Sequence, residues 1–204
     1  MRDEFERQLA LLNEELTTMG GLIESAIANA VKALDGDEHS INKAYDYEKS
    51  IDNKEREIES LSLKLLLTQQ PVASDLRLIS AALKMITDME RIGDQASDIA
   101  EIIGFLNGRI GTDAQYICQM AVAAMRMVTE SVEAYVKRDV AMAEATIQHD
   151  DVVDDLFLKV KESLIQMISE NPKDGEYALD LLMIAKYFER IGDHATNIAE
   201  WVIF

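Results

Sequence analysis

The chain has 204 residues, enough for one or two domains, and its 48% hydrophobic and 28% charged residues are ordinary for a folded globular protein. Its 38 acidic residues outnumber 20 basic ones, and the net charge of -18 excludes a protein built to bind nucleic acid or anionic lipid. Cys118 is the single cysteine, which excludes a disulfide framework and a cysteine-rich zinc site. The lack of a long apolar stretch excludes a membrane span, and the acidic N-terminus excludes a secretory signal. We therefore expect a cytoplasmic protein.

Long helices are favoured throughout, because only two prolines and nine glycines interrupt a chain rich in Ala, Leu, Glu, Lys and Met. From Phe5 to Leu34 apolar residues recur at spacings of three and four, which is the stripe of one long helix. Gly20 and Gly21 lie in the middle of this stripe and predict a bend. Gly36 is typical of a helix end.

The second and third helices are predicted over 38–68 and 72–104. Asp37 is the expected N-cap of the second helix, and Pro71 breaks the chain before the third because it lacks an N–H group. The side chains expected to face inward are Ile41, Ile51, Ile58, Leu61 and Leu65, followed by Leu76, Ile79, Leu83, Ile86, Ile92 and Ile99.

Three more helices are predicted after a linker at 104–112. They cover 113–137, 139–169 with Asp139 as N-cap, and 176–204, and a turn over 171–175 separates the last two.

The chain contains an internal repeat. Residues 90–102 read ERIGDQASDIAEI and residues 189–201 read ERIGDHATNIAEW, with nine of 13 positions identical at an offset of 99. We therefore predict an all-α fold of six long helices in two pseudo-symmetric three-helix bundles, with one repeat over 1–106 and the second over 107–204.

Acidic residues recur at helical spacing in both repeats. Carboxylates at i, i+4 and i+8 lie above one another on a helix and repel, which is unfavourable unless a multivalent cation bridges them. Because each repeat has such a row on its second and third helices, we predict one metal site per repeat on an outer face. The proposed ligands are Glu48, Asp52, Glu90, Asp94 and Asp98, and in the second repeat Asp150, Asp154, Glu189, Asp193 and Asn197.

Oxygen ligands suit iron, manganese, magnesium or calcium, whereas zinc usually takes nitrogen or sulfur. The alternative interpretation is that each acidic row is simply a solvated helix face. Gly93 and Gly192 directly precede the motif aspartates and indicate a close approach of either a helix or a ligand. His149 and His194 are expected at the surface or behind the ligands, although either could supply a nitrogen.

Signatures of catalysis are missing. The chain has no GxxxxGK[ST], GxGxxG, GxSxG or HExxH motif, and it lacks the Glu-x-x-His pair of ferritin-like di-iron bundles.

The repeated acidic motifs and the segment after the second predicted helix resemble those of the PhoU family of phosphate-uptake regulators, and the resemblance covers nearly the whole chain. The resemblance rests on residues 71–77 (PVASDLR), 90–94 (ERIGD) and 189–200 (ERIGDHATNIAE). Asn197 departs from the first copy, which has Asp98 at the equivalent position. Family members usually continue beyond the point that corresponds to Phe204, which is consistent with a shortened chain.

The resemblance implies a metal-binding regulatory adaptor with iron or zinc in multinuclear clusters. It also implies negative control of the phosphate-starvation response through contacts with the ATPase subunit of a phosphate ABC transporter and with a sensor histidine kinase, and a homodimer as the assembly. We expect no enzyme activity. The alternatives are a carboxylate-bridged polynuclear metalloenzyme and a purely structural helical bundle.

Overall fold

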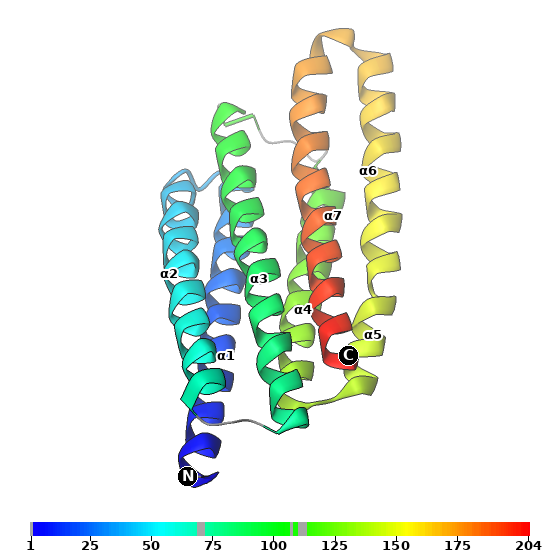
Figure 1. Ribbon diagram of the computed structural model, residues 1–204. Helices are drawn as coiled ribbons and strands as arrows, with labels where there is room; N and C mark the ends of the chain where they lie inside the picture. The colour runs from blue at the N-terminus through cyan, green and yellow to red at the C-terminus, as the bar shows by residue number, and fades with distance from the viewer. Residues whose placement is uncertain (1, 69–71, 107, 110–113) are drawn as a thin grey trace.

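The computed structural model describes residues 2–68, 72–106, 108–109 and 114–204, which are almost entirely helical (Figure 1). No strand occurs among these residues, in agreement with the all-α prediction. The helices in chain order are α1 (Arg2–Leu34), α2 (His39–Thr68), α3 (Ala73–Phe105), α4 (Gln115–Lys137), α5 (Val140–Gln148), α6 (Asp150–Glu170), the short 3-10 helix η2 (Pro172–Asp174) and α7 (Gly175–Ile203).

Two predicted helix starts can be compared with the structure. Asp37 accepts hydrogen bonds from the His39 N–H and the Ser40 hydroxyl, and Asp139 accepts one from the Met142 N–H at 3.0 Å. Both aspartates therefore cap the helices that follow them. The predicted break at Pro71 and the predicted start at 113 lie outside the described residues.

The fifth predicted helix, 139–169, is interrupted at His149 and forms α5 and α6. The His149 N–H bonds to the carbonyl groups of both Ala145 and Thr146, as at the end of a helix. Its ring lies 2.9 Å from a carboxylate oxygen of Glu130 on α4. The sequence around His149 carries no Gly or Pro, so this break has no local signal.

The six long helical segments form two three-helix units that stand side by side (Figure 1). In the first unit α1, α2 and α3 contact one another, and in the second α4 and α7 pack together with the broken fifth helix. The units meet where α3 runs antiparallel to α7 and where α1 lies along α4. One continuous hydrophobic core extends through both units.

The apolar stripes predict the core well. Every stripe residue from Phe5 to Leu34 is buried, because this face of α1 meets α2, α3 and α4. Leu76 is an exception: it is 47% exposed in the first turn of α3, so its predicted inward position is wrong. α1 continues without a break across Gly20, where a Cβ would contact Val132 of α4 at 3.6 Å.

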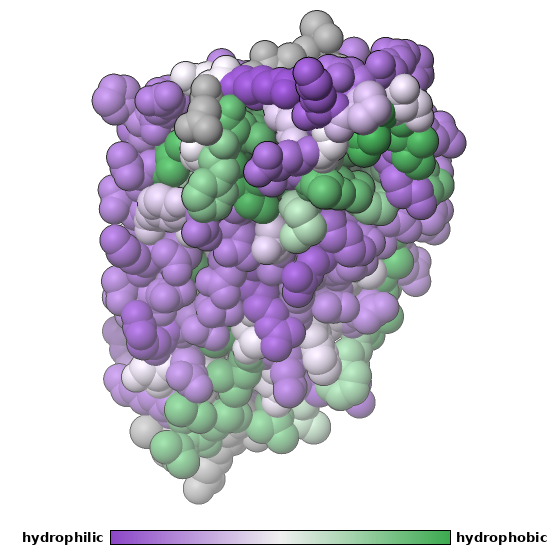
Figure 2. Space-filling model, turned by 90° about the horizontal axis from the view of Figure 1, so that it is seen from above, coloured by the Kyte–Doolittle hydropathy of each residue, from purple (hydrophilic) through white to green (hydrophobic). Residues whose placement is uncertain are grey.

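The face seen in Figure 2 is mainly hydrophilic, with apolar side chains gathered in separate patches. None of the described helices combines the length and the apolar character that crossing a bilayer requires.

Candidate metal centre

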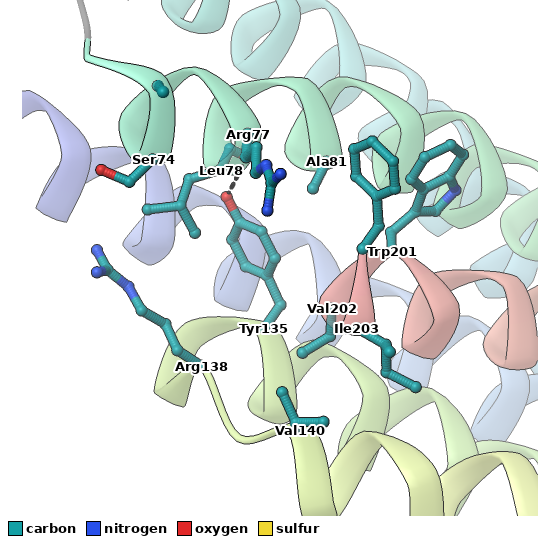
Figure 3. A pocket seen from close by; sticks show the side chains of 12 residues that line it. Ser74, Arg77, Leu78, Ala81, Tyr135, Arg138, Val140, Trp201, Val202 and Ile203 are labelled. Carbon is teal, nitrogen blue, oxygen red and sulfur yellow. Dashed lines mark hydrogen bonds between the residues drawn. The ribbon is translucent and has the colours of Figure 1, made fainter.

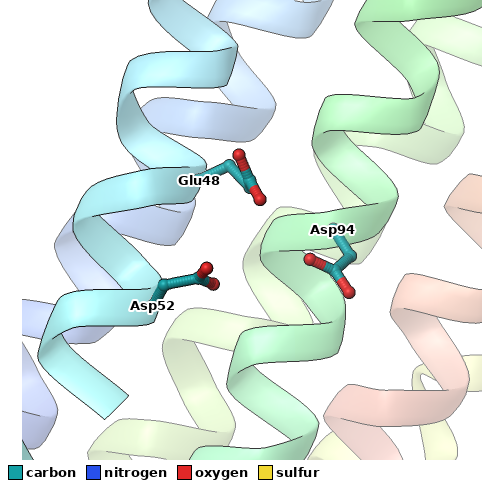
Figure 4. A group of neighbouring side chains, drawn as sticks. All are labelled: Glu48, Asp52 and Asp94. Atoms are coloured by element: carbon teal, nitrogen blue, oxygen red, sulfur yellow. The ribbon is translucent and has the colours of Figure 1, made fainter. Parts of the chain in front are cut away.

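Three carboxylates converge between α2 and α3. Glu48 and Asp52 lie one turn apart on α2, and Asp94 faces them from α3 (Figure 4). One oxygen of each lies within 4.8 Å of the other two, and all three side chains are half-buried. This is the separation at which a single cation can bind all three, and the trio is the one such group among the described residues.

The charges of this first cluster are incompletely compensated. Burial raises the pKa of Glu48, and repulsion from Asp52 and Asp94 raises it further. The pKa of Asp94 is raised by burial and by Asp52 and Asp98. One oxygen of Asp52, Oδ1, is buried and has no hydrogen-bond partner. A bound cation would supply the missing partner, so the site fits a metal.

Two more acids interact electrostatically with this first cluster. Burial raises the pKa of Glu90, with contributions from Asp94, Glu55 and Asp52. The pKa of Glu55 is likewise raised by burial and by Asp52. Glu55 was not among the proposed ligands, although its position three residues after Asp52 on one helix face signalled it.

The motif glycines bring the helices close enough for these acids to meet. A Cβ on Gly93 would lie 3.0 Å from Cδ1 of Ile51 on α2, and one on Gly192 would lie 2.9 Å from Oδ1 of Asp150 on α6. Each glycine therefore permits a close helix–helix contact, one of the two roles expected for it.

The second cluster differs because a lysine forms an ion pair with one of its carboxylates. Asp150, Asp154, Glu189 and Asp193 are electrostatic neighbours. Lys186 Nζ lies 2.5 Å from Oε2 of Glu189, and its charge also opposes the rise in the pKa of Asp154 and of Asp193. The equivalent residue of the first repeat is the uncharged Thr87.

Asp98 and Asn197 occupy the interface between the two units. Tyr187 of α7 donates a hydrogen bond to Asp98, and Arg190 favours its ionised form, although burial raises its pKa overall. Asn197 Nδ2 donates to Oδ1 of Asp88 on α3 at 3.1 Å. The prediction that Asn197 joins Asp150 and Asp154 is therefore corrected, because its amide faces the first unit.

These two contacts are repeats of each other, since the offset of 99 relates Asp88 to Tyr187 and Asp98 to Asn197. This reciprocity is the signature of a pseudo-two-fold axis between α3 and α7. Asp98 keeps a link to the first cluster through its repulsion of Asp94.

Neither candidate histidine faces an acidic cluster directly. His149 Nδ1 pairs with Glu130, and His194 Nδ1 lies 2.9 Å from Oδ1 of the buried Asp88. Both therefore form polar contacts between helices, which agrees with the expectation that they lie at the surface or behind the ligands.

The metal-free protein is expected to be more stable at pH 5 than at pH 7. Burial and four neighbouring carboxylates raise the pKa of Asp150 to about 6, against about 3.8 ordinarily. Its contribution to stability is complete below pH 3.8 and is lost as the pH rises through 6, since only the unfolded chain then ionises it freely. Thermal melts with a chelator at the two pH values measure the difference.

Asp150→Asn should raise the melting temperature at pH 7 and reduce this pH difference, whereas Glu162→Gln on the exposed face of α6 should change neither. An equal pH difference in both variants would contradict the role given to Asp150.

Comparisons with known proteins agree with this architecture. The PhoU domain model matches residues 16–103 and 117–202, one match in each repeat. A phosphate-specific transport system accessory protein PhoU homolog from Clostridium acetobutylicum is 36% identical and covers 100% of this chain and 94% of its own length.

Solved structures give the same result. The crystal structure of PhoU from Pseudomonas aeruginosa has a TM-score of 0.92 at 33% identity, covering 98% of this chain and 97% of that one. The phosphate transport system regulatory protein PhoU from Streptococcus pneumoniae shares the fold, with a TM-score of 0.87 at 22% identity over 98% of this chain and 95% of its own. With the family pattern matched in both repeats and the fold shared over nearly the whole length, this chain belongs to the PhoU family.

Proposed function

We propose that this chain regulates phosphate transport through contacts with other proteins. The carrying observation is the PhoU match in both repeats, together with relatives that are named accessory proteins of phosphate-specific transport systems. The expected partners are the ATPase subunit of a phosphate ABC transporter and a sensor histidine kinase, which places the protein in the cytoplasm. A homodimer is the proposed assembly, and sedimentation of the purified protein tests it.

A pull-down of each partner by the full chain, at low and at moderate salt, tests this function. The net charge of -18 steers the protein toward basic partner surfaces, so binding should weaken as salt rises. Binding to neither partner, together with metal-dependent turnover of a substrate, would support the metalloenzyme alternative instead.

We further propose that the first cluster holds a metal ion, with Glu48, Asp52 and Asp94 as ligands and Glu90, Glu55 and Asp98 close by. Support comes from the 4.8 Å grouping and the unpartnered Asp52 oxygen. Iron is favoured over zinc because the site offers only carboxylates, and the additional acids leave room for a multinuclear cluster. A cation here would neutralise the carboxylates and join α2 to α3. Elemental analysis of the purified protein tests the proposal.

Exchanging one residue between the repeats should exchange their affinities for metal. In Lys186→Thr the second cluster loses its internal cation, so we expect a second metal equivalent per chain. In Thr87→Lys an ammonium group is introduced beside the first cluster, so we expect its metal content to fall at least about tenfold, as for a perturbed ligand environment. Metal per chain, measured after equilibration with ferrous iron and with zinc, decides the matter. Equal metal content in both variants and the parent would contradict this asymmetry.

A further inference from the structure

A cavity of about 550 Å³ opens between the two units (Figure 3). It lies where the first turns of α3 meet the end of α4, the start of α5 and the last turn of α7. Tyr135 is 3% exposed and donates a hydrogen bond from its hydroxyl to the Leu78 carbonyl at 2.8 Å. This bond ties α4 to α3 and fixes one wall of the cavity.

Two arginines give the cavity a positive rim. Arg77 on α3 and Arg138 after α4 stand on either side of the Tyr135 ring in Figure 3. Among the described residues neither guanidinium forms an ion pair with a carboxylate. In a chain with a net charge of -18, two arginines without an acidic partner beside one cavity indicate an acidic ligand.

Arg138 also occupies an unfavourable backbone conformation. Its φ of 55° is left-handed, and it is the one non-glycine residue with positive φ in the described chain. The first repeat has Gly36, with φ 100°, at the equivalent position before the capping aspartate. Glycine fits such a helix end without strain, so the second repeat keeps an arginine against a conformational cost. Strain of this kind points to a function for the side chain.

Part of the cavity lining is apolar and exposed. Trp201 and Phe204 pack edge to face with ring centroids 5.7 Å apart. Val140, Ile203 and Phe204, which all line the cavity, remain 44%, 43% and 66% exposed. Apolar side chains that are exposed at the mouth of the cavity suit the apolar face of a protein segment.

We propose that this cavity and its two arginines bind an acidic amphipathic segment of a partner protein, apolar residues entering the cavity and carboxylates pairing with Arg77 and Arg138. The inference deepens the proposed function, on which it rests, by giving the chemistry of one contact. It also runs against the net charge of the chain, which favours basic partners.

Two synthetic amphipathic peptides test the proposal. They share the same leucine face and differ only in having glutamate or lysine on the flanks. We expect the glutamate peptide to bind the full chain. Its Kd should rise at least tenfold in Arg77→Ala and in Arg138→Gly. Arg56→Ala, at an exposed position of α2, should leave the Kd unchanged. Binding of the lysine peptide, if any, should respond to salt and to none of the three changes.

Arg138→Gly separates function from folding, because it should raise the melting temperature while it weakens binding. No binding of the glutamate peptide, or binding that both arginine variants leave intact, would overturn the proposal. It would equally be overturned if the anionic dye 8-anilinonaphthalene-1-sulfonate bound at the arginines and the peptide did not, since the site would then take small molecules. If the chain still bound the ATPase subunit or the kinase in these cases, the proposed function would stand, and if it bound neither, that function would fail whatever the peptide did.

Discussion

Asp94→Lys should remove the metal from the first cluster. The change deletes one of the three converging oxygens and places an ammonium group among Glu48 and Asp52. Perturbing a metal site through its supporting residues alone typically costs 10–100-fold in affinity, so losing a ligand and adding a positive charge should cost at least about 100-fold. Metal titrated calorimetrically into chelator-treated protein, together with elemental analysis, measures the loss.

The same substitution should act in the opposite direction on the metal-free protein. Lysine relieves the repulsion that raises the pKa of Glu48 and Glu90, so the melting temperature with chelator should rise. Asp46→Lys makes the same change in net charge on an exposed part of α2 and should leave metal affinity unchanged. Undiminished metal binding by Asp94→Lys would refute the assignment of the first cluster.

Leu65→Ala should destabilise the protein by about 2–5 kcal/mol, because it leaves a cavity in the shared core. Leu65 is fully buried, whereas Leu67, two positions further along α2, is 83% exposed. Leu67→Ala makes the same change in helix propensity, which slightly favours Ala, and should change the free energy of unfolding by no more than about 0.5 kcal/mol. For a chain of this size the loss in Leu65→Ala corresponds to about 4–20 °C in the melting temperature.

Calorimetry measures the melting temperature of both leucine variants, with Leu67→Ala as the control for Leu65→Ala. Similar melting temperatures would mean that the face of α2 carrying Leu65 does not contribute to the core as the structure has it.

The elements of the fold follow from the sequence because each long helix carries its own apolar stripe. The apolar stripe of α1 predicts each of its buried stripe residues correctly. The aspartates that cap α2 and α5 are recognisable from their residue type and position. The approach of Glu48 and Asp52 to Asp94 was also predictable, since spacings of four fix the rows and a short connection makes consecutive helices antiparallel neighbours.

What lay beyond prediction depends on contacts between helices that are distant in the sequence. Asn197 carries the same local pattern as a ligand, and only the packing of α7 on α3 shows that it pairs with Asp88. The sequence gives no sign that Lys186 belongs to the second cluster, because its neighbour Asp154 lies on a different helix, α6. At the break between α5 and α6, His149 likewise contacts Glu130, a residue of a different helix.

The single core through both units has a consequence for how such a chain could arise. The faces of α1 and α3 that are buried against α4 and α7 would be bare in an isolated first repeat. Because the second repeat presents equivalent helices in a two-fold arrangement, two copies of one repeat could cover each other in the same way. Covalent fusion then makes this pairing independent of concentration. It also frees each half to diverge, as arginine in place of Gly36 and lysine in place of Thr87 illustrate.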